Sequence, residues 1–105
     1  MPNAARDVAR IILSHAAYGD LVEIGEYGEA HFGSLAADSY HDDIERCFER
    51  LADHPLSGEA RAVWGVGIRY LVCNRHRIVY RLSDDTVQIL RILHHSRDVP
   101  QHLKP

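Results

Sequence analysis

The segment IRYLVCNRHRIVYRLSDDTVQILRIL, residues 68–93, decides the fold. It contains three runs, 68–73, 77–82 and 86–93, that are rich in β-branched and aromatic residues, and such runs favour β-strands. Only three residues separate each run from the next, and most of them are of the polar kinds that turns favour. The segment therefore predicts three consecutive antiparallel strands.

The central run has two different faces, because side chains alternate between the faces of a strand. The residues on one face are Ile78, Tyr80 and Leu82, and those on the other are Arg77, Val79 and Arg81. The first face is apolar and must be covered by another layer. We expect the face with the two arginines to be comparatively open.

Two helices are predicted before these strands. Arg10–Leu13 is short and β-branched and suits a first strand, and Ser14 can cap the helix that follows. Apolar residues then recur at the helical period from His15 to about Phe32. A second helix, with an apolar stripe opposite a charged side, ends before His54–Pro55. The residues of that stripe are Tyr40, Ile44, Cys47, Phe48 and Leu51.

The fold class that follows is α+β, in the order β-α-α-β-β-β, with a helical hairpin packed on one face of an antiparallel sheet. We expect residues 56–60 to form a polar loop and residues 100–105 a frayed tail. The chain is interpreted as a single domain, 1–105, with its core at 8–103 and tails at 1–7 and 104–105.

The composition indicates an ordinary globular protein and excludes several function classes. The chain has 105 residues with a formal net charge of −3, of which 46% are hydrophobic and 26% charged. A negative net charge is unfavourable for binding phosphate backbones, so we expect no direct sequence-specific DNA binding by the protein alone. The apolar runs are too short to cross a bilayer, and we expect a cytoplasmic protein without a membrane partner.

The cysteines and histidines suggest no cofactor chemistry. Cys47 and Cys73 are far apart in the sequence, and a pair of reduced thiols is the expectation for a cytoplasmic protein. The eight histidines are scattered and form no recognisable metal motif. We therefore expect neither a metal nor a cofactor.

Three short motifs carry a resemblance to a known family. They are GIR at 67–69, IVYR at 78–81 and ILRILH at 89–94, the last followed by Arg97–Asp98. Placed in order behind AAYGDLVEIGEYGEAHFG (16–33), they resemble the ParE branch of the RelE/ParE toxin superfamily over nearly the whole chain. The resemblance implies the toxin of a bacterial type II toxin–antitoxin system, of the kind associated with growth arrest and plasmid stabilisation.

Members of this superfamily act in two ways. ParE-like toxins inhibit DNA gyrase and so block replication, whereas RelE-like toxins cut messenger RNA on the ribosome. The ParE resemblance implies a gyrase inhibitor without catalytic residues, held in a hetero-oligomer by a cognate, ParD-like antitoxin. The residues expected to bind the target are Arg69, Arg81, Arg91, His94 and Arg97. The residues expected to bind the antitoxin are Leu21, Ile24, Tyr27, Phe48, Trp64 and Tyr80.

A ribosome-dependent messenger RNA endoribonuclease is the alternative. Cleavage through a 2′-hydroxyl needs a base, an acid and cations around the phosphate. The candidates for these roles are Arg69, Arg81, Arg91, His94 and His95. The lysine-rich catalytic set of RelE is impossible here, because the only lysine is Lys104. A non-toxic remnant that only binds its antitoxin is a further alternative that the sequence leaves open.

The same residues have structural interpretations. Arg81 and Arg91 could pair with carboxylates and stabilise the sheet. His94 is expected at a strand end as a hydrogen-bonded structural histidine, and His95 as a solvated one. Trp64 could belong to the core or could contact a partner.

Overall fold

The computed structural model describes residues 8–104, so the predicted tail 1–7 and residue 105 lie outside the described residues. The elements, in chain order, are β1 (Arg10–Leu13), α1 (His15–Phe32), α2 (Ser34–Asp53), β2 (Glu59–Ala60), the 3-10 helix η1 (Ala62–Trp64), β3 (Ile68–Cys73), β4 (His76–Ser83), β5 (Thr86–His94) and α3 (Val99–His102).

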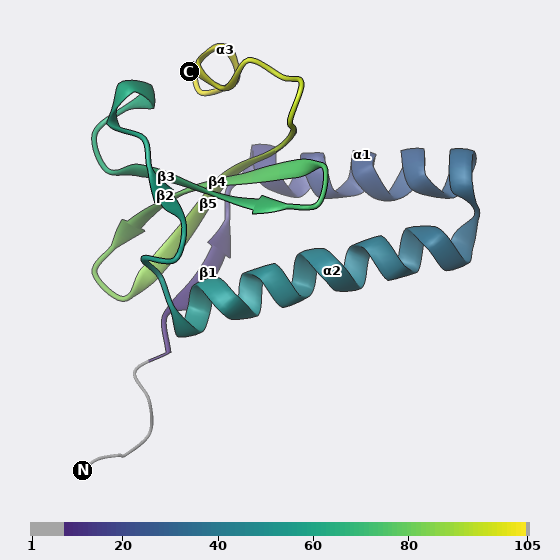
Figure 1. Cartoon of the computed structure of the whole chain (residues 1–105), viewed down its shortest axis with the longest axis horizontal. Coiled ribbons are helices and arrows are strands. Elements are labelled where there is room, and N and C mark those ends of the chain that lie inside the picture. The colour runs from purple at the N-terminus through teal and green to yellow at the C-terminus, as the bar shows by residue number, and fades with distance from the viewer. Residues whose placement is uncertain (1–7, 105) are drawn as a thin grey trace.

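The five strands form one sheet in the order β1-β5-β4-β3-β2, and α1 and α2 form a hairpin beside it (Figure 1). The α+β class, the helix pair and the three consecutive antiparallel strands are confirmed. The sheet is mixed, however, and not antiparallel throughout, because β1 pairs parallel to β5. A parallel partner needs a long crossover, and the helices and strands between β1 and β5 supply it.

The segment 56–60, predicted as a loop, ends in the short edge strand β2. Glu59 and Ala60 pair with Tyr70 and Arg69 of β3. A strand of two residues shows no alternating pattern, which explains why the sequence did not predict it. Gly58 lies just before β2, where an added Cβ would come within 2.6 Å of the Tyr80 ring.

The turns between the last three strands use residues that tolerate the left-handed backbone region. Asn74 has a φ of 55° between β3 and β4, and Asp84 has a φ of 54° between β4 and β5. Asn and Asp adopt this region more readily than other non-glycine residues. These two residues therefore allow the tight reversals that place β3, β4 and β5 side by side.

The main core lies between the sheet and the helix pair. Ile78 and Tyr80 of β4 are fully buried there, and Leu82 packs against the same cluster, which confirms the predicted face of this strand. The other buried members are Ala9, Ala17, Ile44, Phe48, Leu51, Leu71, Cys73, Val87, Ile89 and Ile92. We call this side of the sheet the helix face.

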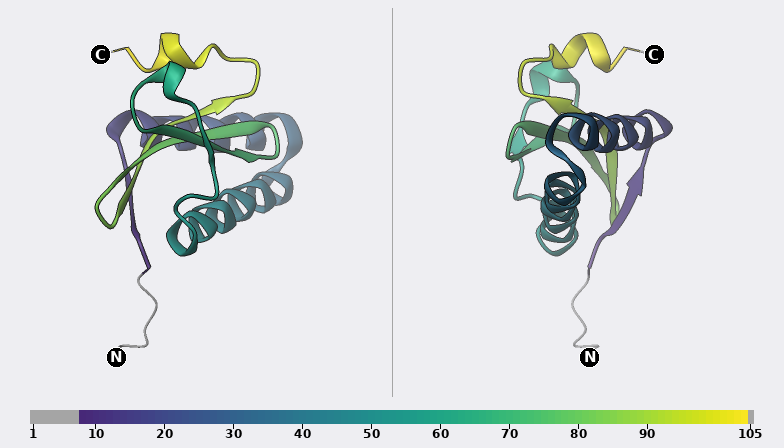
Figure 2. Two further views of the ribbon diagram at one scale, coloured as in Figure 1. Left: turned by 60° about the vertical axis from the view of Figure 1, so that its left-hand side comes forward. Right: turned by 90° about the vertical axis from the view of Figure 1, so that its right-hand side faces the viewer.

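The opposite side, which we call the second face, carries its own core. Val79, Leu93 and Val99 are buried there, and Trp64 and Leu103 pack against them. The expectation of an open face is therefore wrong, because η1 and α3 lie over it (Figure 2). The expectation of a frayed tail is also wrong, because α3 packs over the apolar strand residues of this face.

Candidate functional site

The structure does not bring the five predicted target-binding residues together. Arg81 pairs with Ile68 and Arg91 with Val79, which places both arginines on the second face. Arg69 pairs with Tyr80 on the helix face. The two remaining residues, His94 and Arg97, lie at the end of β5 and in the turn after it, and His94 pairs with His76. The alternative catalytic set shares four of these residues and is divided in the same way.

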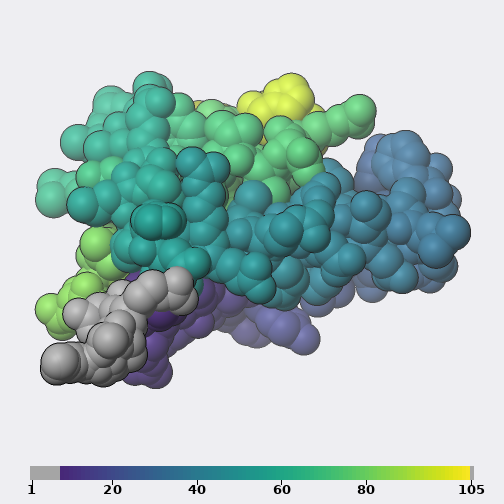
Figure 3. Space-filling model, turned by 60° about the horizontal axis from the view of Figure 1, so that its bottom comes forward, coloured from purple at the N-terminus to yellow at the C-terminus, as the bar shows by residue number. Residues whose placement is uncertain are grey.

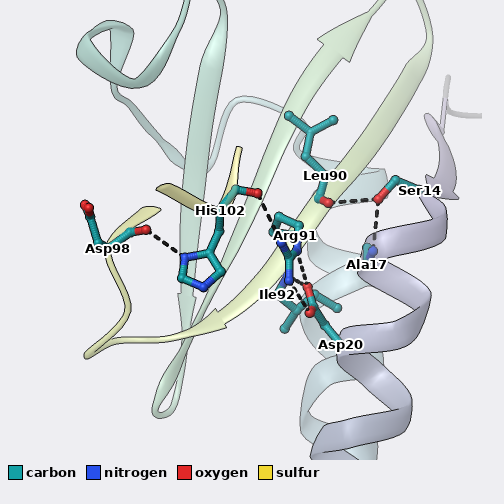
Figure 4. Close-up of polar contacts among 8 residues, drawn as sticks. All are labelled: Ser14, Ala17, Asp20, Leu90, Arg91, Ile92, Asp98 and His102. Carbon is teal, nitrogen blue, oxygen red and sulfur yellow. Dashed lines mark hydrogen bonds and ion pairs between the residues drawn. The ribbon is translucent and has the colours of Figure 1, made fainter. Parts of the chain in front are cut away.

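Arg91 is held inside the fold by Asp20 of α1 (Figure 4). Its Nη2 lies 2.7 Å and its Nε 2.8 Å from the two carboxylate oxygens of Asp20. Its Nη1 donates to the carbonyl of His102 in α3 at 3.0 Å. The bond to Asp20 raises the pKa of Arg91, so this guanidinium stays charged throughout the ordinary pH range. Arg91 therefore has the structural carboxylate partner that the sequence suggested, and its role at the target stays a prediction.

Asp20 also accepts a backbone hydrogen bond along the edge of β5, a role that was not predicted from the sequence. The pairing of β1 with β5 ends at Leu13 and Ile89. Beyond this point the Ser14 hydroxyl donates to Leu90 O at 2.8 Å, and the backbone N–H of Ile92 donates to the Asp20 carboxylate at 2.8 Å. Ser14 also accepts from Ala17 N at 3.0 Å, which confirms it as the cap of α1. Side chains at the start of α1 thus make the hydrogen bonds that a neighbouring strand would otherwise make with this part of β5.

Arg69 and Arg81 contact backbone carbonyls. Arg69 Nη1 donates to Gly58 O at 2.7 Å, where it supports the loop before β2. Arg81 is exposed, and its Nε donates to Val66 O at 3.4 Å. Arg81 therefore keeps most of its hydrogen-bonding capacity for another molecule, and so does Arg97, which is exposed.

A row of rings lies at the end of the sheet where β3 turns into β4, and it consists of Tyr40, His76, His94 and His95. The His94 ring lies 5.5 Å from that of His76 and 4.3 Å from that of His95. The Tyr40 hydroxyl of α2 lies 2.5 Å from His76 Nδ1. Burial, followed by the nearby His94, lowers the pKa of His76 to about 4. His76 is therefore neutral near pH 7 and shares a hydrogen bond with the Tyr40 hydroxyl, and neither residue was singled out from the sequence for this role.

His94 forms a local hydrogen-bonded turn. Its Nδ1 lies 2.8 Å from Ser96 Oγ and accepts from Ser96 N at 3.2 Å. Desolvation and the neighbouring His95 lower the pKa of His94, so it too is uncharged near neutral pH. The hydrogen-bonded histidine expected at the strand end is confirmed, and His95 is exposed as expected.

A shallow apolar groove runs along α1 and α2 to the free edge of β1, and we call it the helix–edge groove. Leu21 and His41 line both of its parts. Exposed apolar side chains line it, among them Val22, 44% exposed, and Tyr18, 63% exposed. Figure 3 shows the molecule from this side, with α2 across the front and β1 below it. The acidic residues that line the groove are Glu26, Glu29, Asp38, Glu45 and Glu49.

The predicted antitoxin-binding residues are distributed over three regions. Leu21 and the nearly buried Phe48 line the helix–edge groove, and Ile24 packs into the main core beneath it. Tyr27 is 59% exposed and stacks on His31. Tyr80 is fully buried, and its hydroxyl donates to Pro55 O at 2.6 Å and accepts from Gly58 N at 3.0 Å. Tyr80 is therefore a core residue, which corrects its expected contact with a partner.

Trp64 lies at the rim of the second face. Its ring is 5.2 Å from that of Tyr70, and the guanidinium groups of Arg61 and Arg77 lie 5.0 Å and 5.4 Å from its centre. Cation–π contacts of this kind hold a tryptophan in place. Trp64 thus packs against the second core, on the side of the sheet opposite α1 and α2.

The described residues offer no metal centre or membrane segment. Within residues 8–104, no group of three or more His, Cys, Asp or Glu side chains is placed to hold a metal ion. None of the helices in this part of the chain combines the length and apolar character that a bilayer crossing requires.

Comparison with known proteins identifies the family. The model of the ParE toxin of the type II toxin–antitoxin system parDE matches residues 11–99. The chain belongs to the ParE toxin family. Among ParE relatives, Toxin ParE1 of Caulobacter vibrioides is 32% identical over 91 residues, which cover 87% of this chain and 94% of the relative. Toxin ParE1 of Mycobacterium tuberculosis is 30% identical over 96 residues, covering 90% and 98%.

Solved structures support the ParE fold. A chain from the chromosomal ParDE system of Pseudomonas aeruginosa superposes with a TM-score of 0.72 at 22% identity, covering 84% of this chain and 97% of that one. A chain of the RelBE2 toxin–antitoxin complex of M. tuberculosis gives a TM-score of 0.59 at 23% identity, covering 86% and 94%. The expected superfamily and ParE branch are confirmed, and the chain is the toxin of a type II toxin–antitoxin system.

Proposed function

We propose that this ParE-family toxin inhibits DNA gyrase and so blocks replication, and that it acts in the cytoplasm, where gyrase works. Membership of the ParE family carries the proposal. The dispersal of the candidate catalytic residues supports it, because Arg69 and Arg81 lie on opposite faces of the sheet and Arg91 is occupied by Asp20. Acid–base chemistry needs several groups around one reacting atom, whereas inhibition by binding does not.

The test is a supercoiling assay with purified gyrase and toxin freed of its antitoxin. Loss of supercoiling at toxin concentrations comparable to gyrase supports the proposal. In cells, induction of the toxin alone should stop DNA synthesis before protein synthesis. Normal supercoiling at a large excess of toxin, or transcripts cut within codons as the first event, would refute gyrase as the target and favour the ribonuclease. Unchanged growth would indicate a non-toxic remnant.

We propose that Arg81 and Arg97 contact the target. Both side chains are exposed, and Arg81 contributes only one long backbone contact to the fold. Arg81→Gln and Arg97→Gln should each weaken gyrase inhibition about tenfold or more, because each removes a charged donor from the interface. Arg50→Gln, on the exposed side of α2, is the matched control and should leave inhibition unchanged.

We propose that a ParD-like antitoxin binds in the helix–edge groove. The groove combines exposed Val22 and Tyr18 with an acidic rim that includes Glu26 and Glu29. An amphipathic segment with basic residues beside its apolar face is complementary to both features. Such a segment can be disordered when free and order itself as it binds.

Two variants of the groove test this placement. Val22→Asp introduces a charge among apolar side chains and should weaken antitoxin binding about tenfold or more, as measured by titration calorimetry. Glu29→Lys should reduce the affinity and reverse its salt dependence. Glu59→Lys, on β2 at the opposite edge of the sheet, is the control. If both groove variants bind the antitoxin with unchanged affinity, the antitoxin binds another surface.

A further inference from the structure

Two cysteines that are 26 positions apart in the chain meet between α2 and the sheet. Cys47 Sγ of α2 lies 2.7 Å from Cys73 Sγ at the end of β3, and both residues are free thiols. This separation is only slightly longer than the roughly 2.04 Å of a disulfide bond. A small movement of the two side chains is therefore sufficient to join them.

The two thiols differ in accessibility. Cys73 is 3% exposed and its thiol points to the carbonyl of Asp43 at 3.6 Å, whereas Cys47 is partly exposed. Burial raises the pKa of Cys73, so this thiol stays protonated and does not react first with an oxidant. The pair thus has one partly exposed cysteine, which can react first with a solute, and one buried thiol that can resolve the product.

We propose that Cys47 and Cys73 are a site of reversible oxidation, at which a peroxide or a small disulfide closes a covalent link between α2 and β3. With hydrogen peroxide, the Cys47 thiolate attacks one peroxide oxygen, and a sulfenic acid and hydroxide form. Cys73 sulfur then attacks the Cys47 sulfur, its proton leaves with the displaced hydroxide as water, and the disulfide forms. Two electrons pass from the thiols to the peroxide, and a dithiol reductant reverses the change.

The link has a defined structural effect. It closes the loop between α2 and β3, and so reduces the conformational freedom of the unfolded chain. Cys47 lies on the side of α2 opposite the groove residues Glu45 and Glu49, as helical spacing requires. Oxidation should therefore stabilise the toxin without changing its affinity for a molecule bound in the helix–edge groove. Cytoplasmic disulfides are usually transient and respond to redox conditions, which suits such a site.

The experiment uses the full chain, fully reduced and then treated with hydrogen peroxide or oxidised glutathione. We expect the mass to fall by two hydrogen masses, both thiols to become resistant to alkylation, and peptide mapping to find Cys47 joined to Cys73. The melting temperature without reductant should rise by on the order of 10 °C. Both cysteines remaining open to alkylation, or only bonds between two chains, would overturn the proposal.

Two variants separate the roles of the sulfurs. Cys73→Ala removes the resolving thiol without placing a hydroxyl in the core, so peroxide should leave a sulfenic acid on Cys47 that a carbon nucleophile traps, and glutathione should stay attached there. Cys47→Ala should leave Cys73 slow to react and the melting temperature independent of oxidant. Rapid oxidation of Cys73 in the Cys47→Ala variant would contradict the proposed order of reaction.

Discussion

Asp20→Ala is the substitution that the structure predicts to be most informative about the fold. The carboxylate is 8% exposed and accepts two bonds from Arg91 and one from the backbone of Ile92. Its removal leaves the N–H of Ile92 without a partner in the protein and leaves Arg91 without its counter-charge. An unsatisfied buried donor costs roughly 1–3 kcal/mol, and breaking one side of a buried ion pair costs roughly 3–5 kcal/mol.

For Asp20→Ala the lower end of the range for a broken buried ion pair applies. The Arg91 side chain is 22% exposed and retains the carbonyl of His102, so water and one hydrogen bond compensate part of the loss. We therefore expect Asp20→Ala to lower the free energy of unfolding by about 3 kcal/mol. For a domain of this size the melting temperature should fall by roughly 15 °C.

The assay is thermal and urea unfolding, followed by circular dichroism, of the toxin freed of its antitoxin. Asp42→Ala, at an exposed position of α2, is the matched control and should change stability by less than about 0.5 kcal/mol. Arg91→Met and the double variant complete a mutant cycle, in which the coupling energy should exceed about 1 kcal/mol. A coupling near zero, or a melting temperature of Asp20→Ala like that of the control, would refute the structural role assigned to the pair.

The remaining predictions concern the loop before β2 and the row of rings. Gly58→Ala should lower the free energy of unfolding by about 2 kcal/mol or more in chemical denaturation, because the new Cβ would lie 2.6 Å from Tyr80, whereas Gly19→Ala, with open space around it, should be neutral or stabilising. Tyr80→Phe removes the hydroxyl that bridges two loop groups and should cost about 1–2 kcal/mol in the same assay, and no loss would contradict that bridge. Because the pKa of His76 is lowered to about 4, the unfolded chain takes up a proton at this residue at a higher pH than the folded chain does. The contribution of the neutral ring to the free energy of unfolding is therefore complete above pH 6.5 and is lost as the pH falls towards 4. Comparison of melting curves from pH 7 to pH 4.5 should therefore show a shallower loss for His76→Gln than for the original chain, and parallel curves would rule the effect out.

The elements that the sequence predicted well have local causes. The strands 68–73, 77–82 and 86–93 and the helix 15–32 follow from alternation, helical spacing and turn residues, and each can be recognised from its own segment. The partner of β1 has no such signal. Whether the strand Arg10–Leu13 pairs parallel or antiparallel depends on where the helix pair returns the chain, which is a property of the whole fold.

The roles of individual charged residues were predicted less well, for the same physical reason. Arg91 and Arg81 look alike in the sequence, since both interrupt apolar runs, and both lie on the second face. They differ because α1 brings a carboxylate to Arg91 from 71 positions away, while Arg81 meets only the carbonyl of Val66. A contact between residues so far apart in the chain cannot be recognised from the local periodicity of either segment. The short helix α3 was missed because four residues are too few to show a period.

The edge of β5 connects the stability of the toxin with its proposed binding surface. Ser14 N donates to Ile89 O at 2.9 Å, and Ser14 Oγ and Asp20 continue the contacts along β5, so these two residues fix where α1 begins. The helix–edge groove lies between α1, α2 and β1, and its shape depends on that position. Asp20→Ala should therefore weaken antitoxin binding although Asp20 does not line the groove. Exposed groove residues such as Val22 are the appropriate test of the docking site, because a change there leaves the attachment of α1 intact.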